Sequence, residues 1–200
     1  KNVGLTKLVD NGEDSEEGFC LCSTVRGGLC NRDCEMRKVW SECAYWAHKG
    51  WNCGNKRIQL LLRKEELCFE VVRCQGMGLG LQATKRIRPD TAVCVYWGRV
   101  SKPEKVKQNK NSHCYVAEFS NGLVLNAAKE GSLARYVNSS CQPNLRLEEW
   151  DVCGERVLVY VSTSEIVRGD LLTTSYNDPS WVGKCCCRLK GCCGSIGDPQ

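Results

Sequence analysis

Closely spaced cysteines near the N-terminus constrain this chain more than any other feature of its sequence. The chain has 17 Cys in 200 residues, and its first cluster comprises Cys20, Cys22, Cys30, Cys34, Cys43 and Cys53. The CxC and CxxxC pairs, followed by wider gaps, suit chelation of a tetrahedral ion by several chain segments. The sequence therefore predicts a metal-bound module in this region.

The alternative to metal binding is a set of disulfides in an oxidising compartment. Residues 1–19 are polar, become acidic in their second half and do not resemble a signal peptide. No stretch reaches the roughly 18 apolar residues of a membrane span. We therefore expect an intracellular location, where dense cysteine clusters bind zinc more often than they form disulfides. The two cysteines of a CxC pair are also too close to bridge each other easily.

Length and charge set broad limits on the fold and on the partners. A chain of 200 residues can form one medium domain, or one domain with small satellites, and bury a core. The net charge of +5 is modest, and Lys and Arg are spread out apart from Lys102 to Lys110. This balance is compatible with docking near nucleic acid and does not imply a DNA-reading module. Residues 1–18 have few large apolar groups and are expected to be a flexible lead-in.

The remaining pattern predicts a mainly β chain with short helices. The expected elements are a short helix or connector at 56–67, strands at 68–73, 91–97 and 157–161, a hairpin within 114–126, and a final strand ending on Tyr176. The hairpin prediction rests on Asn121-Gly122, which is a strong turn signal between two apolar runs.

The glycine-rich stretch from Gly78 to Ala83 fits two different motifs. GLGLQA matches the dinucleotide fingerprint GxGxxG/A after a strand. The residues from Thr84 to Trp97 contain Pro89 and a β-rich run, and do not predict a helix whose N-terminus would bind a pyrophosphate. The family resemblance that the next motifs carry implies a turn at Gly78-Leu79-Gly80, where the missing Cβ lets the backbone lie close to a ligand.

Two further stretches carry a family resemblance. RYVNSSCQPN, from Arg135 to Asn144, and LLTTSY, from Leu171 to Tyr176, resemble the motifs NHSCxPN and ELxYDY of SET-domain protein lysine methyltransferases. With the cysteine clusters, the chain is similar to the group of these enzymes that carries AWS and post-SET zinc modules, the Set2, NSD and Ash1 group. The resemblance implies a SET-domain β-fold with small curved sheets, in which the two motifs cross in a pseudoknot-like active site. It also implies an AWS-like module at 19–63, a catalytic domain at 64–180 and a post-SET segment at 181–200.

The resemblance also implies three zinc ions. In the AWS module seven cysteines hold two ions, and Cys30 corresponds to the bridging one. The position of the sixth ligand has no Cys in this chain, and we expect His48 to replace it, because imidazole nitrogen is a normal zinc ligand. The alternative for His48 is an exposed side chain beside an incompletely ligated ion. The third ion is expected on Cys141, Cys185, Cys187 and Cys192, whereas Cys193 and Cys186 sit at variable positions and are expected to be free thiols.

The expected cofactor is S-adenosylmethionine, with S-adenosylhomocysteine as the product. By resemblance Tyr176 is the catalytic tyrosine, and Tyr96 and Tyr115 line the channel for the target lysine. The residues expected to bind the cofactor are Met77, Gly78, Leu79, Cys114, Tyr115, Asn138, Ser139 and Tyr176, with Cys186 and Ile196 covering the adenine. The alternative for each tyrosine is ordinary packing in the core.

The implied function is methylation of histone H3 at its lysine 36 in nucleosomes, in the nucleus, with the histone tail as partner. Non-specific contact of basic residues with DNA is compatible with this function, and no membrane is involved. The sequence departs from the motifs at Ser139, Leu171, Thr174 and Ser175. A small Thr174 should enlarge the lysine pocket and favour di- or trimethylation. The alternatives are a catalytically weak SET module that binds a histone or another protein, and a zinc-rich nucleic-acid adaptor or secreted disulfide protein.

Overall fold

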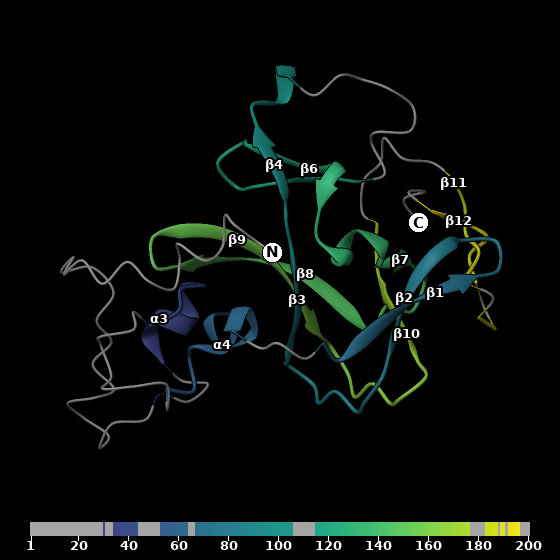
Figure 1. The fold of residues 1–200 in the computed structure, drawn as a ribbon, viewed down its shortest axis with the longest axis horizontal. Coiled ribbons are helices and arrows are strands. Elements are labelled where there is room, and N and C mark those ends of the chain that lie inside the picture. Colours follow the sequence, from purple (N-terminus) through teal and green to yellow (C-terminus); the bar gives the residue numbers. More distant parts are fainter. Residues whose placement is uncertain are drawn as a thin grey trace. The chain divides into compact units, whose positions relative to one another are not determined.

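The computed structural model describes most of the chain after Cys34 (Figure 1). The described residues are 30, 34–43, 53–63, 67–105, 115–176, 183–187, 189–190 and 192–196. They form mostly strands in small sheets, with a few short helices, as the sequence predicted. No helix among them has both the length and the apolar character that crossing a membrane requires.

The chain divides into two compact units. The first combines Lys1–Glu65 with Glu149–Val159, and the second combines Glu66–Glu148 with Tyr160–Gln200. Strands β8 (Leu145–Val152) and β9 (Glu155–Ser162) pass from one unit into the other.

In the first unit, four cysteines form a buried cluster. Cys30, Cys34, Cys43 and Cys53 are buried together, with Met36 packed against them. Two short helices flank this cluster, α3 (Glu35–Lys38) and α4 (Arg57–Arg63). Helix α4 confirms the helix that the sequence predicted in this region.

The buried Glu42 fixes the start of α4. Its carboxylate accepts hydrogen bonds from the backbone N–H of Ile58 at 2.5 Å and of Gln59 at 2.9 Å. These N–H groups belong to the first turn, where a helix offers no backbone acceptor. Burial raises the pKa of Glu42 to about 7, although the two backbone donors act in the opposite direction. The Gln59 side chain in turn donates to the carbonyl of Cys43 at 2.9 Å. Hydrogen bonds in both directions therefore fix α4 against the cysteine segment.

Aromatic and backbone contacts attach the cysteine segment to the end of β8. The backbone N–H of Glu42 donates to Asp151 at 2.9 Å, and that of Asp151 donates to Trp40 at 2.8 Å. The rings of Trp40 and Trp150 meet edge to face at 5.4 Å, and the Arg57 guanidinium lies 4.4 Å from the centre of the Trp150 ring. Such cation–π contacts add to the apolar packing.

Four small sheets carry the strands. The remaining strands are β1 (Phe69–Cys74), β2 (Gly78–Ala83), β3 (Ala92–Tyr96), β4 (Gly98–Ser101), β5 (Val116–Glu118), β6 (Val124–Gly131), β7 (Asn138–Ser139), β10 (Leu171–Thr174), β11 (Gly183–Lys184) and β12 (Ser195–Ile196). The sheet orders are β1-β2-β10-β7, β3-β9-β8, β4-β6-β5 and β11-β12. Two 3-10 helices, Pro103–Lys105 and Leu133–Tyr136, join them. Fully buried aliphatic side chains from several of these segments supply the core: Leu81, Val93, Leu145, Ile166 and Leu172.

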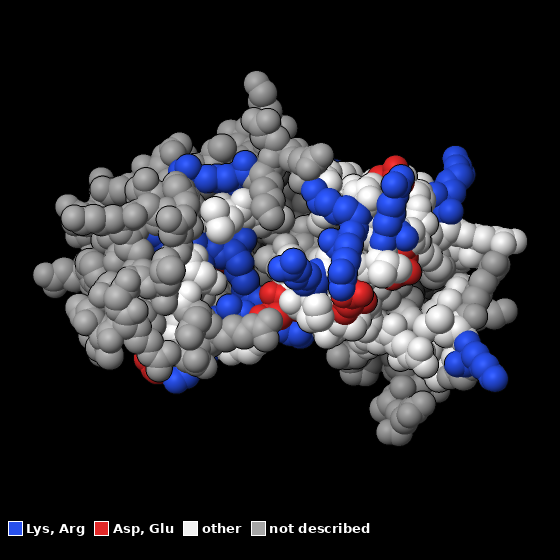
Figure 2. All heavy atoms as spheres, turned by 90° about the horizontal axis from the view of Figure 1, so that it is seen from below, with Lys and Arg blue, Asp and Glu red and all other residues white. Residues whose placement is uncertain are grey.

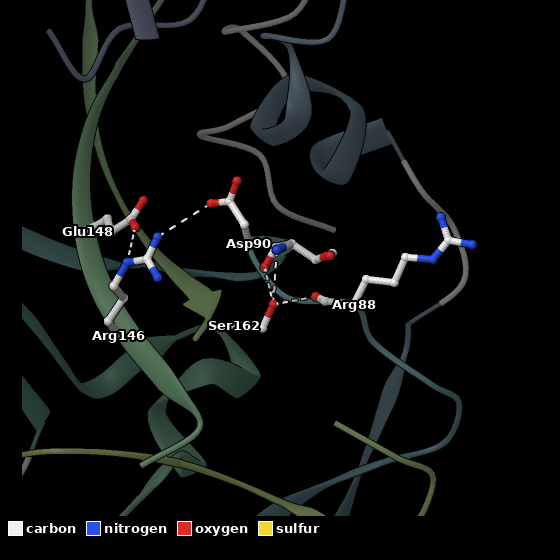
Figure 3. A network of polar contacts seen from close by, with 6 residues as sticks. Arg88, Asp90, Arg146, Glu148 and Ser162 are labelled. Carbon is white, nitrogen blue, oxygen red and sulfur yellow. Dashed lines mark hydrogen bonds and ion pairs between the residues drawn. The ribbon is translucent and has the colours of Figure 1, made fainter. Parts of the chain in front are cut away.

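A polar network anchors the loop before β3 (Figure 3). Arg146 on β8 forms ion pairs with Glu148, which is buried, and with Asp90 at 3.4 Å. The Ser162 hydroxyl donates to the carbonyl of Arg88 at 2.6 Å and accepts from the N–H of Thr91 at 2.9 Å. Ser162 is fully buried, so these bonds satisfy a polar group that would otherwise be costly to bury.

Most predicted strands and the hairpin are confirmed, with three differences, the first being that the final strand, β10, ends at Thr174 and not on Tyr176. β5 and β6 pair antiparallel around a turn where Gly122 has a φ of 77° and the Asn121 side chain accepts from the N–H of Leu123. The expected turn at Gly78-Leu79-Gly80 is wrong, because these residues open β2 and the turn lies at 75–77. Strand β8 was not predicted. Between β2 and β3 the chain forms no helix, which agrees with rejecting the dinucleotide motif.

Replacing Glu42 with alanine tests the carboxylate contact with α4. We expect Glu42→Ala to lower the free energy of unfolding by about 2 kcal/mol or more, because each buried donor left unpaired costs roughly 1–3 kcal/mol. Thermal unfolding of the two proteins measures the loss. Glu35→Ala is the matched control, since Glu35 is an exposed carboxylate that pairs with Lys38 on α3. Equal losses in the two variants would contradict this role of Glu42.

Candidate active site

The two motif segments lie side by side. Strand β7 pairs in parallel with β10, with Asn138 opposite Thr173 and Ser139 opposite Thr174. The backbone N–H of Ser140 extends the pairing by donating to the Thr174 carbonyl at 2.9 Å. We call this pairing of β7 with β10 the crossing. The structure thus brings together two segments that are about thirty residues apart in the sequence.

A single asparagine side chain reinforces the crossing. The Asn144 amide donates to the Leu171 carbonyl at 2.8 Å and accepts from the backbone N–H of Thr173 at 2.9 Å. Its side chain therefore imitates a peptide group and supplies the hydrogen bonds of one more paired residue. The Asn144 backbone carbonyl accepts from the N–H of Thr163 at 2.9 Å, which links Asn144 to the residue after β9.

Three tyrosines gather beside the crossing. Tyr176 lies two residues after the last residue of β10, Thr174, and donates from its hydroxyl to the Val137 carbonyl at 2.7 Å. The rings of Tyr96 and Tyr160 meet edge to face, with centroids 5.9 Å apart and planes at 80°. Burial is the main cause that raises the pKa of Tyr160 well above its ordinary value, and the neighbouring Tyr96 and Tyr176 add to the shift. Burial and the two neighbouring tyrosines therefore keep the Tyr160 phenol neutral at physiological pH.

The sequence analysis did not single out Tyr160 as a site residue. It placed the residue only within a predicted strand, and Tyr160 is indeed one of six consecutive buried residues at the end of β9. A signal was present, because tyrosine is the only residue of the run VLVYV with a polar tip, which needs a polar environment when buried.

The glycine-rich strand β2 lies next to the crossing. β2 pairs antiparallel with β10, with Leu172 opposite Leu81. The Asn138 side chain reaches across and donates to the Leu79 carbonyl at 2.9 Å. A Cβ at Gly80 would lie 2.8 Å from that Asn138 nitrogen and 2.4 Å from the Cys74 sulfur. Glycine at position 80 is therefore what allows β1, β2 and β7 to approach one another.

Tyr115 and Arg135 lie together in the same unit. The Arg135 guanidinium is 4.5 Å from the centre of the Tyr115 ring and donates to the Ala128 carbonyl at 2.8 Å. Tyr115 is half-buried at the start of β5, and the predicted cofactor residue Cys114 lies outside the described residues. Met77, Gly78 and Leu79 form the end of the turn and the start of β2.

Four thiols assigned to one zinc from the sequence lie within reach of a single ion. The sulfurs of Cys141, Cys185, Cys187 and Cys192 all lie within 4.8 Å of one another. The Cys141 sulfur is 3.4 Å from that of Cys185 and 3.7 Å from that of Cys192. A tetrahedral zinc with Zn–S bonds of about 2.3 Å separates its thiolates by roughly 3.8 Å. The donor set therefore fits zinc in both chemistry and spacing.

Backbone hydrogen bonds favour the thiolate form of Cys187, whereas the contact with Cys193 raises the pKa of Cys141 and burial raises that of Cys185. Backbone hydrogen bonds at Cys141, and then at Leu189, lower the pKa of Cys187 to about 6. Zinc binds the thiolate and not the thiol, so a lowered pKa assists metal binding at neutral pH. The cluster also has a neighbour that was expected to be a free thiol: the Cys193 sulfur lies 3.1 Å from that of Cys141.

The tail that carries these cysteines also contacts the β1–β2 turn. β11 pairs antiparallel with β12, and the backbone N–H of Cys185 donates to Gly194 at 3.0 Å. A Cβ placed on Gly76 would lie 3.8 Å from the side chain of Cys186, which is half-buried. The side chain of Ile196, the other predicted adenine contact, lies outside the described residues.

The N-terminal cysteines form a second group. The sulfurs of Cys30, Cys34 and Cys43 lie within 4.8 Å of one another, and Cys53 is buried in the same cluster. Asn55 donates its backbone N–H to the Cys53 sulfur at 3.4 Å and its side-chain amide to the Cys43 sulfur at 3.3 Å. Such outer donors orient the thiolates of a metal site. Cys20, Cys22 and His48 lie outside the described residues, and every described cysteine is an unbridged thiol.

Replacing Gly80 with alanine tests the close approach of the strands. We expect Gly80→Ala to displace Asn138 from the Leu79 carbonyl and to lower the melting temperature, because its Cβ meets two atoms closer than 3.0 Å. The loss should be about 1–3 kcal/mol, as for other overpacked sites. Cys74→Ala in the same chain removes the nearer of the two atoms and should recover part of the loss. No interaction between the two substitutions in the double-mutant cycle would contradict this packing argument.

Comparisons with known proteins agree with this geometry. Residues 78–177 match the SET domain family. The chain is 30% identical over 216 residues to histone-lysine N-methyltransferase SETD2 of Homo sapiens, which covers 98% of this chain and 8% of that protein.

Two further relatives are also similar over most of this chain, and the chain covers a larger share of their length. Histone-lysine N-methyltransferase ASHH3 of Arabidopsis thaliana is 27% identical over 98% of this chain and 57% of its own length. A protein of Aspergillus fumigatus named histone-lysine N-methyltransferase, H3 lysine-36 specific, is 30% identical over 82% of this chain and 18% of its own length. The chain thus spans only part of each of these relatives, and it belongs to the SET-domain family.

Proposed function

We propose that this chain is an S-adenosylmethionine-dependent protein-lysine N-methyltransferase domain that acts on histone H3, at lysine 36 of nucleosomes. The observation that carries the proposal is the position of the Tyr176 hydroxyl, which the Val137 carbonyl holds at the crossing. Because the hydroxyl proton is donated to Val137, the oxygen lone pairs are available to accept a hydrogen bond from a target amine.

S-adenosylmethionine, when bound, supplies a methyl group on a positively charged sulfur. Its proposed contacts are Asn138, Ser139, Tyr176 and Tyr115, the segment Met77 to Leu79, and Cys114. Cys186 and Ile196 would cover its adenine. Strand β2 and the crossing adjoin through the Asn138 contact to Leu79 at 2.9 Å, which supports one site built from both.

The chain's own residues would align the target lysine and remove water from it. Methyl transfer is an in-line displacement, so its rate depends on holding the amine in line with the donor carbon. The amine must be neutral, and a free lysine has a pKa near 10.4. A channel of Tyr96, Tyr115 and Tyr176, together with the buried Tyr160, would disfavour the ammonium by desolvation. The aromatic faces would also tolerate the methylated cation that forms.

Zinc would tie the cofactor site to the crossing. We propose one ion on Cys141, Cys185, Cys187 and Cys192, and two ions in the N-terminal cluster with Cys20, Cys22 and His48 among their ligands. We also propose the division into an AWS-like module at 19–63, a SET domain at 64–180 and a post-SET segment at 181–200. Cys141 directly follows Ser140 in the crossing, so removal of its ion should disturb the tail and the active site together.

The relatives are named as histone-lysine N-methyltransferases, which supports a histone substrate for this chain. A histone substrate in turn supports a nuclear location. The Aspergillus fumigatus protein is named for lysine 36 of H3, which supports that site for this chain. Figure 2 shows one face, where Lys and Arg side chains lie in several separate groups, some with Asp or Glu beside them. Two exposed arginines, Arg86 and Arg156, form ion pairs with Glu165 and Glu149. This pattern supports weak, non-specific contact with nucleosomal DNA and does not suggest a sequence-reading surface.

Methyl transfer to recombinant nucleosomes tests the activity. We expect Tyr176→Phe to lower kcat by at least about 100-fold, since a positioned hydroxyl at the reacting atoms commonly contributes a factor of about 100 to 10,000. The transfer of labelled methyl, with the modified residue identified by mass spectrometry, measures it. Tyr136→Phe is the matched control, because it removes a hydroxyl from the neighbouring 3-10 helix.

If zinc-loaded wild type binds the cofactor and transfers no methyl to nucleosomes, free histones or histone peptides, the proposed activity is wrong. The departures at Ser139, Leu171, Thr174 and Ser175 would then identify a module that binds its partner without turnover.

The degree of methylation should depend on Thr174. This residue is buried at the end of β10, two positions before Tyr176, and its small side chain favours a pocket that accepts a di- or trimethylated lysine. We expect Thr174→Phe to shift the product toward monomethyl-lysine, because a larger ring fills the space of the added methyl groups. Mass spectrometry of the histone peptide reports the three products. A wild type that stops at monomethyl-lysine would contradict this role.

A further inference from the structure

The C-terminal cysteine cluster contains more thiols than one tetrahedral ion uses. Besides the four sulfurs that lie within 4.8 Å of one another, Cys193 places its sulfur 3.1 Å from that of Cys141. This distance is shorter than those from Cys141 to Cys185, 3.4 Å, and to Cys192, 3.7 Å. The Cys193 sulfur is therefore nearer to Cys141 than the sulfurs of Cys185 and Cys192 are, although it is not one of the four grouped sulfurs.

The two thiols differ in their access to solvent. Cys193 is exposed, whereas Cys141 is half-buried in the crossing. The Cys193 sulfur also lies 3.0 Å from the Ser195 carbonyl, which holds it on the edge of the cluster. An exposed thiol beside a second thiol is the arrangement in which oxidation of the first is resolved by the second. A disulfide bond is about 2.05 Å long, so the sulfurs need to approach by about 1 Å.

We propose that Cys193 and Cys141 form a reversible disulfide when the protein meets a peroxide, and that this withdraws Cys141 from the zinc site. The proposal rests on the proposed function, since it takes the four-cysteine cluster to hold zinc. The sequence signal is the dipeptide Cys192-Cys193, in which the second cysteine has no place in the CxCxxxxC ligand pattern.

The chemistry balances with one peroxide per disulfide. The Cys193 sulfur attacks one peroxide oxygen, the O–O bond breaks, and a sulfenic acid and one water form. The Cys141 sulfur then leaves zinc and attacks the Cys193 sulfur, which forms the S–S bond and expels the sulfenic oxygen as a second water after protonation. The two sulfurs together lose two electrons, which reduce the peroxide. A dithiol or glutathione reverses the step by thiol–disulfide exchange.

The disulfide would act directly on the crossing. Cys141 follows Ser140, whose backbone N–H donates to Thr174 at 2.9 Å, and the tail that carries Cys193 also carries Cys186 against the β1–β2 turn. Loss of one of four zinc ligands weakens the hold on the ion, so the tail and the cofactor contacts would loosen together.

Zinc release and disulfide mapping test the proposal. The zinc-loaded wild type, Cys193→Ser and the control Cys186→Ser are treated with hydrogen peroxide, and released zinc is followed with a metallochromic dye. Peptide mass spectrometry under non-reducing conditions then identifies the bonded cysteines. We expect wild type and Cys186→Ser to release one ion with a Cys141–Cys193 bond. Cys193→Ser should release it at least about five-fold more slowly, because exposed thiols are oxidised first.

Failure of this proposal differs from failure of the zinc site itself. Equal zinc content in untreated wild type and in Cys185→Ser would overturn the zinc site. If Cys185→Ser lacks one ion while Cys193→Ser releases zinc as fast as wild type, or if the bond maps to another pair, the disulfide proposal is wrong. Methyl transfer that a dithiol restores in oxidised wild type would add functional support.

Discussion

The parallel pairing of β7 with β10 is the contact on which the rest of the site depends. Parallel strands cannot be joined by a tight turn, and β7 has only two residues, so little of the pairing comes from the ladder alone. The Asn144 side chain and the Ser140 N–H supply the additional hydrogen bonds that hold the two segments together. As a result, Asn138, Cys141 and Tyr176 lie within a few residues of one contact.

The cysteine cluster brings a further segment to the same contact. Its four sulfurs come from Cys141 and from the tail after residue 184, whose described residues include the short strand β12, paired with β11. Four thiolates repel one another without a cation, whereas an ion converts the same arrangement into a stable link. Order in the tail is therefore expected to follow metal binding, and Cys141 makes the crossing sensitive to the state of the cluster.

Elements that depend on neighbouring residues in the sequence could be predicted from it. Asn121-Gly122 predicted the hairpin, and the apolar run at β3 predicted a strand in which all five residues are buried. Strand β8 was missed because LRLEEWDV places charges where a strand normally has apolar residues. Its Arg146 and Glu148 are satisfied by each other and by Asp90, which lies more than fifty residues earlier. Tyr160 was missed for a similar reason, since only the folded chain brings it to Tyr96 and Tyr176.

The glycine pattern at β2 also has a cause within the fold. Glycine is depleted in strands, and the family resemblance had implied a turn at Gly78 to Gly80. In the structure Gly80 leaves the space that the Asn138 amide occupies when it donates to Leu79. An asparagine amide has two N–H donors and an acceptor oxygen, so this bond leaves Asn138 with capacity for a ligand. The glycine thus positions Asn138. Asn138 in turn links β2 to the crossing within the proposed cofactor site.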